Sequence, residues 1–486
     1  MTSSPIRRAL VSFSGLTAVG LVLAGCTIGP NYSRPSVATT PAFKEADGWT
    51  KAAPGDLSDR GDWWTLFNDS QLNDLEAKVA VSNQTLIAAE AAYRESVALL
   101  DQQRATLFPS VSLTPSATRT KSAAVATTIA PGVTETIPST TANRYTASLG
   151  ASWDVDLWGS IRRSIESARD NAQASKADIA NAKLSAQILL AADYVQLRAT
   201  DEQKRLLDDT IKAYTDNLRI VQNKFNVGVA QRSDVLTAQT SLASTQAQDI
   251  DLKRTRAQFE HAIAVLIGQP PANFTLTVIP YALKSPSVPL GVPSGLLQRR
   301  PDVAAAERTM AAANAQIGVA QAGFFPSLSL TASDGFASST LSRFFSAANN
   351  SWSLGASAAQ TVFDAGSTFA KVRGARATYD QNVATYRQTV LTAFQQVEDN
   401  IAADRVLDDE YTYDAAASQE ADEAEKITNN QYVAGTVDYT SVVVAQNTAL
   451  TARRTLIQTD SARLVAVVDL ISALGGGWND RELAQK

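Results

Sequence analysis

The sequence predicts an α+β membrane protein with an internal duplication, in which each half carries one pair of β-strands and one long helical hairpin. Three observations support this fold class: a repeat at a fixed offset, four segments of alternating polar and apolar residues, and two stretches of 67 residues almost free of Pro and Gly. The repeat is clearest where FNVG at 225–228 returns as YVAG at 432–435, 207 positions later. A constant offset indicates a rigid repeated element, and drifting offsets elsewhere indicate loops that tolerate insertion.

The composition excludes several classes of function. The chain has 486 residues, of which 45% are apolar and 19% charged, as is typical of a large folded protein. Its net charge of −5 argues against a nucleic-acid partner. One His and one Cys cannot supply a His/Cys metal site, a disulfide framework or a paired Cys nucleophile. We therefore expect no enzymatic activity, no metal and no cofactor.

The N-terminal segment predicts export and a lipid anchor. Arg7 and Arg8 precede a short apolar run at 9–24, and small residues lead to Cys26, the only thiol. This pattern is typical of a lipoprotein signal peptide, 1–25, whose cleavage leaves a lipidated Cys26 at the mature N-terminus. An ordinary signal peptide with an unrelated Cys is the alternative. The apolar run is too short to span a bilayer as a helix.

Four segments predict β-strands: 110–118, 145–153, 327–333 and 351–358. In each, Ser, Thr or Gly alternates with apolar or aromatic residues. Period-two alternation over roughly ten residues is typical of a membrane strand with one lipid face and one wet face. A soluble, half-buried hairpin would have a similar pattern and remains the alternative. The segments 120–142 and 337–349, which join the strands of each pair, are expected to be external loops.

Two segments of 67 residues, 160–226 and 367–433, predict helices about 100 Å long. Each is expected to turn at a glycine, Gly228 or Gly435, and to return as a second helix over 233–267 or 440–474. Shorter helices at 83–106 and 300–322 are expected to lead into the strands of each half. Near the end of the first long helix, apolar residues step by alternate fours and threes, which predicts a coiled-coil seam: Leu207, Ile211, Tyr214, Leu218, Val221 and Phe225.

Four strands cannot close a barrel, because about eight is the practical minimum. Every backbone polar group must nevertheless be paired within a bilayer. The chain is therefore expected to oligomerise so that edge strands of neighbouring copies pair. A trimer would give twelve strands and a near-sixfold helical tube, whereas a dimer would give eight strands and a plugged lumen. The length of the helices favours the larger, open ring.

Several motifs resemble those of the outer membrane efflux proteins, the TolC/OprM-like channels, and of their NodT-type lipoprotein branch. These are LQRRPDV at 297–303 with AAER at 305–308, CTIGPNYSRP at 26–35, and LGGGW at 474–478. The most specific residues of this signature are Arg299, Arg300, Pro301 and Asp302.

The resemblance implies a homotrimer with a twelve-stranded transmembrane β-barrel, continued by a long periplasmic α-helical barrel. It also implies binding to a periplasmic adaptor protein and an inner-membrane transporter, in most cases of the proton-driven drug-exporting class, and contact with outer-membrane lipid. The channel would do no chemistry, and its cargo would be set by the transporter. A lipid-anchored periplasmic coiled-coil scaffold without a pore is the alternative function.

The expected domain organisation follows the repeat. After the signal peptide at 1–25, we expect a lipidated N-terminal segment with an equatorial region at 26–82. The first repeat would occupy 83–268, and an equatorial linker 269–300. The second repeat would occupy 301–475, followed by a tail at 476–486.

The resemblance also implies a periplasmic gate at the helix tips, just past the repeated glycines. Relatives commonly carry aspartates six and nine residues after the second glycine, where this chain has Ser441 and Val444. Tyr432 matches a tyrosine that helps to lock the closed tip in relatives. The expected gate therefore depends less on charge, and its candidate residues are Tyr432, Thr440, Ser441, Val443, Val444 and Asp234. Val443 and Val444 could equally pack the hairpin.

The segment 398–425 holds eleven acidic residues and one basic residue, Arg405. Two interpretations remain open. The acids could form a solvated helix face, or they could line the passage and favour cations.

Overall fold

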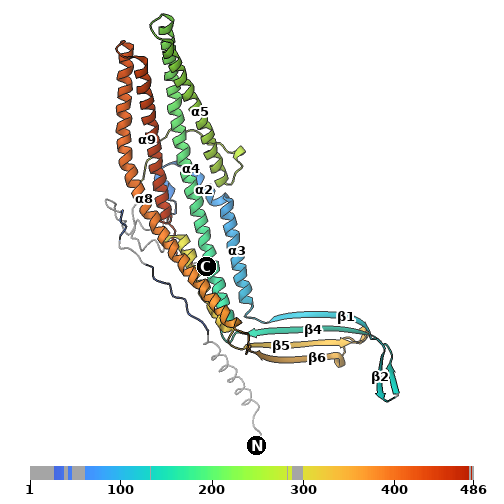
Figure 1. Cartoon of the computed structure of the whole chain (residues 1–486). Helices are drawn as coiled ribbons and strands as arrows, with labels where there is room; N and C mark the ends of the chain where they lie inside the picture. The colour runs from blue at the N-terminus through green and yellow to red at the C-terminus, as the bar shows by residue number, and fades with distance from the viewer. Residues whose placement is uncertain are drawn as a thin grey trace. The chain divides into compact units, whose positions relative to one another are not determined.

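The computed structural model describes residues 27–37, 42–45, 61–131, 133–281, 283–286, 299–480 and 483. Cys26 and the preceding signal segment lie outside the described residues. The chain divides into two compact units. One combines the residues up to Arg34 with Glu95–Ala172 and Arg308–Val383, and the other combines Pro35–Arg94, Gln173–Glu307 and Ala384–Lys486. The first unit carries the strands labelled in Figure 1, and the second carries most of the helices.

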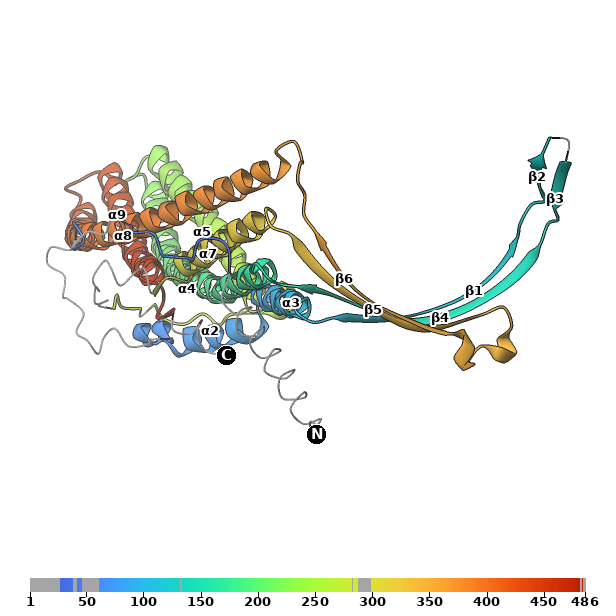
Figure 2. The ribbon, with the colours of Figure 1, turned by 90° about the horizontal axis from the view of Figure 1, so that it is seen from below.

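The strands of both repeats form one antiparallel sheet in the order β1-β4-β5-β6. Its members are β1 (Ser110–Lys121), β4 (Thr141–Val155), β5 (Ser327–Ser338) and β6 (Asn350–Ala359). The two strand pairs of the repeat meet where β4 pairs with β5, with Tyr145 opposite Ser338. Within the described residues β1 and β6 each pair on one side only, so the sheet has two open edges. Figure 2 shows the strands as one curved ribbon.

The two faces of this sheet differ in the way the alternation predicts. On one face, hydroxyl groups oppose each other across the strands, with Oγ atoms of Ser110 and Ser152 2.9 Å apart and those of Ser333 and Ser353 2.9 Å apart. The other face is apolar and exposed; it includes Val111, Leu113, Leu149, Trp352 and Leu354, and Asp334 is its acidic exception. A soluble half-buried sheet needs one covered face, and β1 and β6 are exposed along their full length. The exposure of the sheet therefore favours membrane strands over a soluble, half-buried hairpin.

The two connections within the strand pairs are structured differently. Between β1 and β4 the chain forms a small hairpin, β2 (Val125–Ala130) and β3 (Val133–Ile137), where we expected only a loop. Its Val, Thr and Ile residues are β-branched, which favours extended backbone over an irregular loop. Between β5 and β6 the connection instead has two single-turn helices, η4 (Leu341–Arg343) and η5 (Ala347–Asn349), and a cluster of Phe336, Phe344 and Phe345.

The long helices follow the repeat with equal lengths in both halves. They are α4 (Ser160–Asn226), α5 (Arg232–Leu266), α8 (Ser367–Val433) and α9 (Tyr439–Ala473), and they confirm the predicted hairpins within one residue. The leading helices are α3 (Gln84–Ala105) and α7 (Pro301–Ala322). Along the predicted seam, Leu207, Tyr214 and Val221 are buried, and the intervening apolar residues are half-buried. No helix in the described part of the chain is long and apolar enough to cross a membrane.

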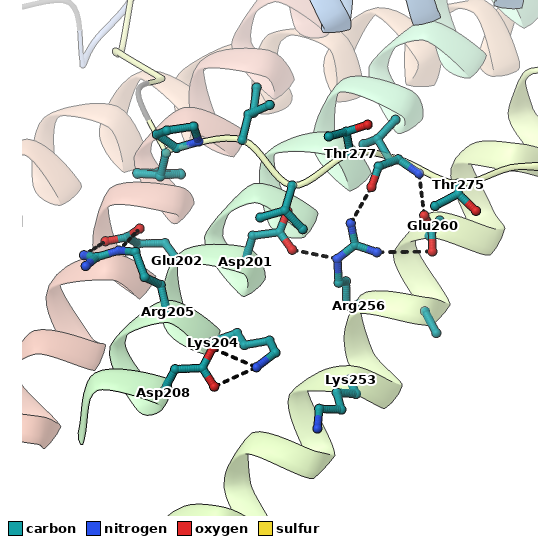
Figure 3. A pocket seen from close by; sticks show the side chains of 16 residues that line it. Asp201, Glu202, Lys204, Arg205, Asp208, Lys253, Arg256, Glu260, Thr275 and Thr277 are labelled. Carbon is teal, nitrogen blue, oxygen red and sulfur yellow. Dashed lines mark hydrogen bonds and ion pairs between the residues drawn. The ribbon is translucent and has the colours of Figure 1, made fainter. Parts of the chain in front are cut away.

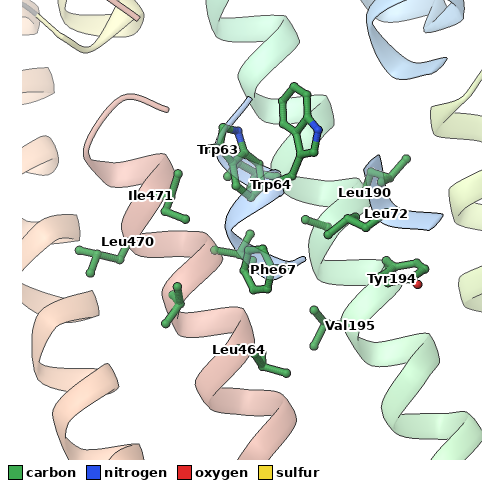
Figure 4. Close-up of a cluster of buried hydrophobic side chains, with 14 of the residues drawn as sticks. Trp63, Trp64, Phe67, Leu72, Leu190, Tyr194, Val195, Leu464, Leu470 and Ile471 are labelled. Atoms are coloured by element: carbon green, nitrogen blue, oxygen red, sulfur yellow. The ribbon is translucent and has the colours of Figure 1, made fainter. Parts of the chain in front are cut away.

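The main core lies where a short N-terminal element meets the long helices. The turn η1 (Trp63–Phe67) and helix α2 (Ser70–Ser82) place their apolar side chains against α4 and α9. Figure 4 shows Trp63, Trp64 and Phe67 between α9, which carries Leu464 and Ile471, and α4, which carries Leu190. Asp69 caps α2 by accepting bonds from two backbone amides, and its second oxygen accepts from the Tyr194 hydroxyl at 2.8 Å.

Candidate functional site

Both hairpin tips turn at the repeated glycine in the same way. Gly228 has a φ of +77° and Gly435 a φ of +76°, and a Cβ at either position would meet nothing within 4 Å. Glycine is therefore needed for the left-handed backbone rather than for space. In each turn the glycine N–H donates three residues back, to Phe225 O at 2.9 Å and to Tyr432 O at 3.1 Å.

An apolar cluster joins the two tips. Val221 of α4 and Val235 of α5 are buried together with Tyr439 and Val442 of α9. Leu218, Phe225, Tyr432 and Val443 pack against them and are half-buried. Because the cluster takes residues from both repeats, the hairpins are held to each other at this level and cannot separate without exposing it.

Tyr432 is the polar-aromatic centre of this tip cluster. Its ring lies 5.5 Å from that of Tyr439, and the Lys224 Nζ lies over it at 3.8 Å from the ring centroid. Lys224 belongs to α4, so the cation–π contact links the first hairpin to the second. Burial, and secondarily the charge of Asp234, raises the pKa of Tyr432. Burial also raises the pKa of Tyr439, to about 12.

The predicted gate residues fall into two groups. Tyr432, Val443 and Asp234 are half-buried, and the first two belong to the tip cluster. Thr440, Ser441 and Val444 are exposed, with Val444 exposed to 60%. Of the two valines, Val443 packs the hairpin and Val444 does not.

Sequence reasoning missed Lys224, Tyr439 and Val442. Nothing in the six-residue seam or in the repeat singled out Lys224, because its partner is far away in sequence. Val442 is the counterpart of Val235, 207 residues earlier, and both are buried in the tip cluster. The repeat could therefore have pointed to Val442 and Val235 as a pair.

The acidic residues at the tips cap helices. Asp234 accepts from the Gln231 backbone N–H at 3.1 Å in a capping box at the start of α5. In the second copy the acid sits three residues earlier in the repeat, and Asp438 accepts from the N–H of Ser441 at 2.8 Å and from its hydroxyl at 2.7 Å. These bonds lower the pKa of Asp438. Each hairpin therefore has one capping carboxylate, although Asp234 and Asp438 occupy different positions of the repeat.

The signature residues lie away from the tips, at the start of α7. Buried Arg300 donates to Asp302 through two nitrogens, at 3.0 and 2.6 Å, and to Gln396 of α8 at 2.8 Å and Ala473 O of α9 at 3.2 Å. Pro301 opens the helix, where its missing N–H costs nothing. A Cβ on Gly475 would overlap the Arg299 carbonyl, so this glycine permits a close backbone approach. The signature is therefore a structural clasp.

The acidic run on α8 is partly neutralised. Arg453 pairs with Asp422 and Glu425 at 2.7 and 2.9 Å, Arg463 pairs with Asp408, and Glu398 accepts from the backbone of Lys44 at 2.8 Å. Asp409, Glu410, Glu420 and Glu423 are exposed. Among the described residues no group of His, Cys, Asp or Glu could hold a metal ion.

A pocket of about 1170 Å³ lies beside residues 201–208 of α4 and 253–260 of α5, under the segment 275–281. Figure 3 shows Arg256 at its wall, with Nε 2.7 Å from Asp201 and Nη2 donating to Leu276 O at 2.7 Å. Glu260 accepts from the Leu276 N–H at 2.5 Å, and buried Arg198 donates to Thr277 O at 3.0 Å. We call 275–281 with these contacts the strap. The charged side chains of Arg256, Asp201 and Glu260 bind each other or the strap backbone. We therefore assign these groups a structural role.

Comparison with known proteins gives consistent results over nearly the whole chain. A family model described as outer membrane efflux protein matches residues 77–269 and 292–476. The toluene efflux pump outer membrane protein TtgC of Pseudomonas putida is 30% identical over 481 residues, which cover 97% of this chain and 96% of that protein. The pyoverdine export outer membrane protein OpmQ of Pseudomonas aeruginosa is 32% identical over 444 residues, covering 90% and 93%.

Solved structures show the same fold. The outer-membrane channel OprN has a TM-score of 0.84 at 31% identity, with 93% of this chain and 100% of that chain covered. The open state of the Neisseria gonorrhoeae MtrE outer membrane channel has a TM-score of 0.81 at 26% identity, covering 94% and 99%. The predicted α+β class and its family resemblance are confirmed by these matches.

Proposed function

Because this chain belongs to the outer membrane efflux protein family, we propose that it is the outer-membrane exit duct of a tripartite efflux system. It conducts small molecules passively from an inner-membrane transporter and a periplasmic adaptor to the exterior. The observation that carries this proposal is the sheet with one hydroxyl face, one exposed apolar face and two open edges, joined in the same chain to two long helical hairpins. A duct needs all of these, and a periplasmic scaffold has no use for the sheet.

The assembly that follows is a homotrimer. Pairing β6 of one copy with β1 of the next satisfies both open edges and gives twelve strands. Three copies of two hairpins give six hairpins around one axis, continuing as a periplasmic helical barrel. We further propose that Cys26 is lipidated, which anchors the chain in the outer membrane, and that the domain boundaries follow the repeat as given above.

The gate is proposed at the hairpin tips. Tyr432 and Val443 would keep the tip packed and Asp234 would cap α5, while Thr440, Ser441 and Val444 are exposed and would face the constriction. Because Val444 touches no tip core, replacing it by Asp should change the passage without disturbing the fold. If Val444→Asp and Tyr432→Ala both leave single-channel conductance and antibiotic uptake unchanged, the constriction lies elsewhere.

The cargo is set by the transporter rather than by the duct. The names of similar proteins specify different cargoes: toluene for TtgC, pyoverdine for OpmQ, and cations for CusC of Escherichia coli. One fold therefore serves unrelated molecules, and the proton-driven class of the transporter stays a prediction.

Planar-bilayer recording of the detergent-purified protein tests the duct directly. We expect discrete conductance steps from a preparation that is trimeric by light scattering. A preparation without steps and without trimers would leave the lipid-anchored scaffold as the better explanation.

A further inference from the structure

The first residues after Cys26 are held in a specific site at the base of the sheet. Ile28 donates its N–H to Trp158 O at 2.9 Å. Trp158 lies between the end of β4 and the start of α4, donates its ring N–H to Pro326 O at 2.7 Å, and stacks on Phe325 at 4.8 Å. The segment 27–31 is therefore attached to the junction from which β4 and β5 both leave.

One buried arginine makes most of the bonds to this segment. Arg163 of α4 is exposed to only 3%, and it donates to Ile28 O at 3.2 Å, Gly29 O at 3.1 Å and Asn31 Oδ1 at 2.8 Å. Its remaining nitrogen pairs with Glu166 at 2.7 Å. A buried guanidinium needs such acceptors, because an unpaired buried charge is costly. Two of the three acceptors are backbone carbonyls, so these bonds depend on the backbone conformation of the segment more than on its side chains.

Glycines make the close fit possible. Gly318 is an interior residue of α7, where glycine is less favourable than alanine. A Cβ at this position would lie 2.7 Å from Ile28 O and 3.0 Å from Arg163 Cγ, and a Cβ on Gly29 would overlap Gly318. A Cβ on Gly159 would lie 2.7 Å from Thr27 Cγ2. Asn314 of α7 adds a bond to Pro30 O at 3.0 Å.

We propose that Arg163 and Gly318 form a seat that fixes residues 27–31 at the base of the sheet, and that this seat sets where a lipid on the neighbouring Cys26 enters the bilayer. The second clause rests on the lipidation proposed above. An unseated segment would be a tether that lengthens by about 3.3–3.6 Å per residue, so the lipid could enter the membrane at many distances from the barrel. When residues 27–31 occupy the seat, the lipid enters the same leaflet next to the strands of its own chain.

The seat itself is tested by a spin label on the exposed residue Ser33, introduced as Ser33→Cys in the full-length trimer. The lipidated thiol of Cys26 is a thioether and takes no label. We expect an immobilised spectrum from the parent and loss of the immobile component in Arg163→Gln and in Gly318→Ala. Two controls should keep it: Arg162→Gln, whose parent residue pairs with Asp156, and Gly374→Ala, a helical glycine with nothing within 4 Å of a Cβ. An immobile label in both seat variants would refute the seat.

The link to the lipid is tested by a double-mutant cycle. The measured quantity is the fraction of protein recovered from the outer membrane as folded trimer. Gly318→Ala and Cys26→Ser should each lower it, and the double variant should be no worse than Cys26→Ser, since both act through one anchor. Additive losses would show that the seat only stabilises the fold. Palmitate labelling of the parent separates the outcomes: unlabelled protein overturns the lipid clause, whereas absent conductance overturns the duct alone.

Discussion

Lys224 and Tyr432 come from different hairpins, and their contact is the polar link at the tip. A cation over an aromatic ring contributes about 0.5–1 kcal/mol when it is partly exposed. The contact needs the ring of Tyr432 rather than its hydroxyl. At the proposed gate, charge can therefore act through an aromatic face, although Ser441 and Val444 themselves carry no charge.

Lys224→Gln should weaken tip closure, and Tyr432→Ala should weaken it more, because it also removes the ring from the apolar cluster. Tyr432→Phe and Lys224→Arg keep ring and cation and serve as controls. Single-channel conductance in planar bilayers measures the effect. Equal conductance in Lys224→Gln and the parent would mean that packing alone holds the tip.

Glu76 is a second residue whose environment decides its behaviour. It lies on the core face of α2 at 0% exposure, and neither carboxylate oxygen has a hydrogen-bond partner among the described residues. Burial raises its pKa to about 9, so the folded protein holds it uncharged at neutral pH.

Replacing Glu76 should change the pH dependence of stability. Because the folded pKa is raised, the contribution of Glu76 is fully present below its ordinary pKa of 4.5 and is lost as pH rises towards about 9. The slope is about 1.4 kcal/mol per pH unit within that window. Glu76→Gln should therefore raise the thermal midpoint clearly at pH 8 and little at pH 5, whereas Glu90→Gln at an exposed site should do neither. Parallel curves for Glu76→Gln and the parent would contradict the buried acid.

At the scale of elements, sequence patterns predicted the long periodic helices and strands. They missed short elements that are stabilised by contacts with distant parts of the chain. The hairpins of α4–α5 and α8–α9 were predictable because a long run almost free of Pro and Gly ends at a repeated glycine. The β2–β3 hairpin and α2 were missed, since short elements are stabilised by capping and by contacts with distant helices rather than by their own sequence. The candidate gate was half predictable. Its positions were implied by the family resemblance, but the division into packed and exposed residues depends on how two hairpins meet.

The strap should behave as a unit. Arg256→Ala removes one of the two arginines that pair with Asp201 and the donor to Leu276 O, at a cost of up to about 3–5 kcal/mol for breaking a buried ion pair. Faster hydrogen exchange of 275–281 would report the release. Arg254→Ala, two residues earlier on the same helix and in an exposed pair with Asp251, should cost less than about 1 kcal/mol. Similar exchange in both variants would show that the strap is held by apolar contacts.

At the scale of the whole molecule, the sheet must present one face to lipid and the other to water. Leu354 and Ser353 are neighbours on the edge strand β6 with opposite orientations. This pair allows the assignment of the two faces to be tested with the same new side chain.

Leu354→Arg should prevent stable insertion, because an arginine on a lipid face costs about 2–4 kcal/mol at the bilayer midplane. Ser353→Arg should insert and lower single-channel conductance instead. Recovery of heat-resistant trimer from outer-membrane fractions, together with bilayer recording, measures both. The reverse result would exchange the lipid face and the lumen face.

The order β1-β4-β5-β6 also has a consequence for the time course of folding. Each helical hairpin joins neighbouring segments, but the contact of β4 with β5 brings together residues from opposite halves of the chain. Closing so long a loop is slow compared with forming local helices. The hairpins can therefore form while the sheet is still unpaired, and the strands are complete only after the second repeat has left the translocation machinery. Until then β4 lacks its β5 partner, and the edges of β1 and β6 stay open until neighbouring copies pair. These unpaired edges are templates for wrong pairing, so a periplasmic chaperone would act in this interval.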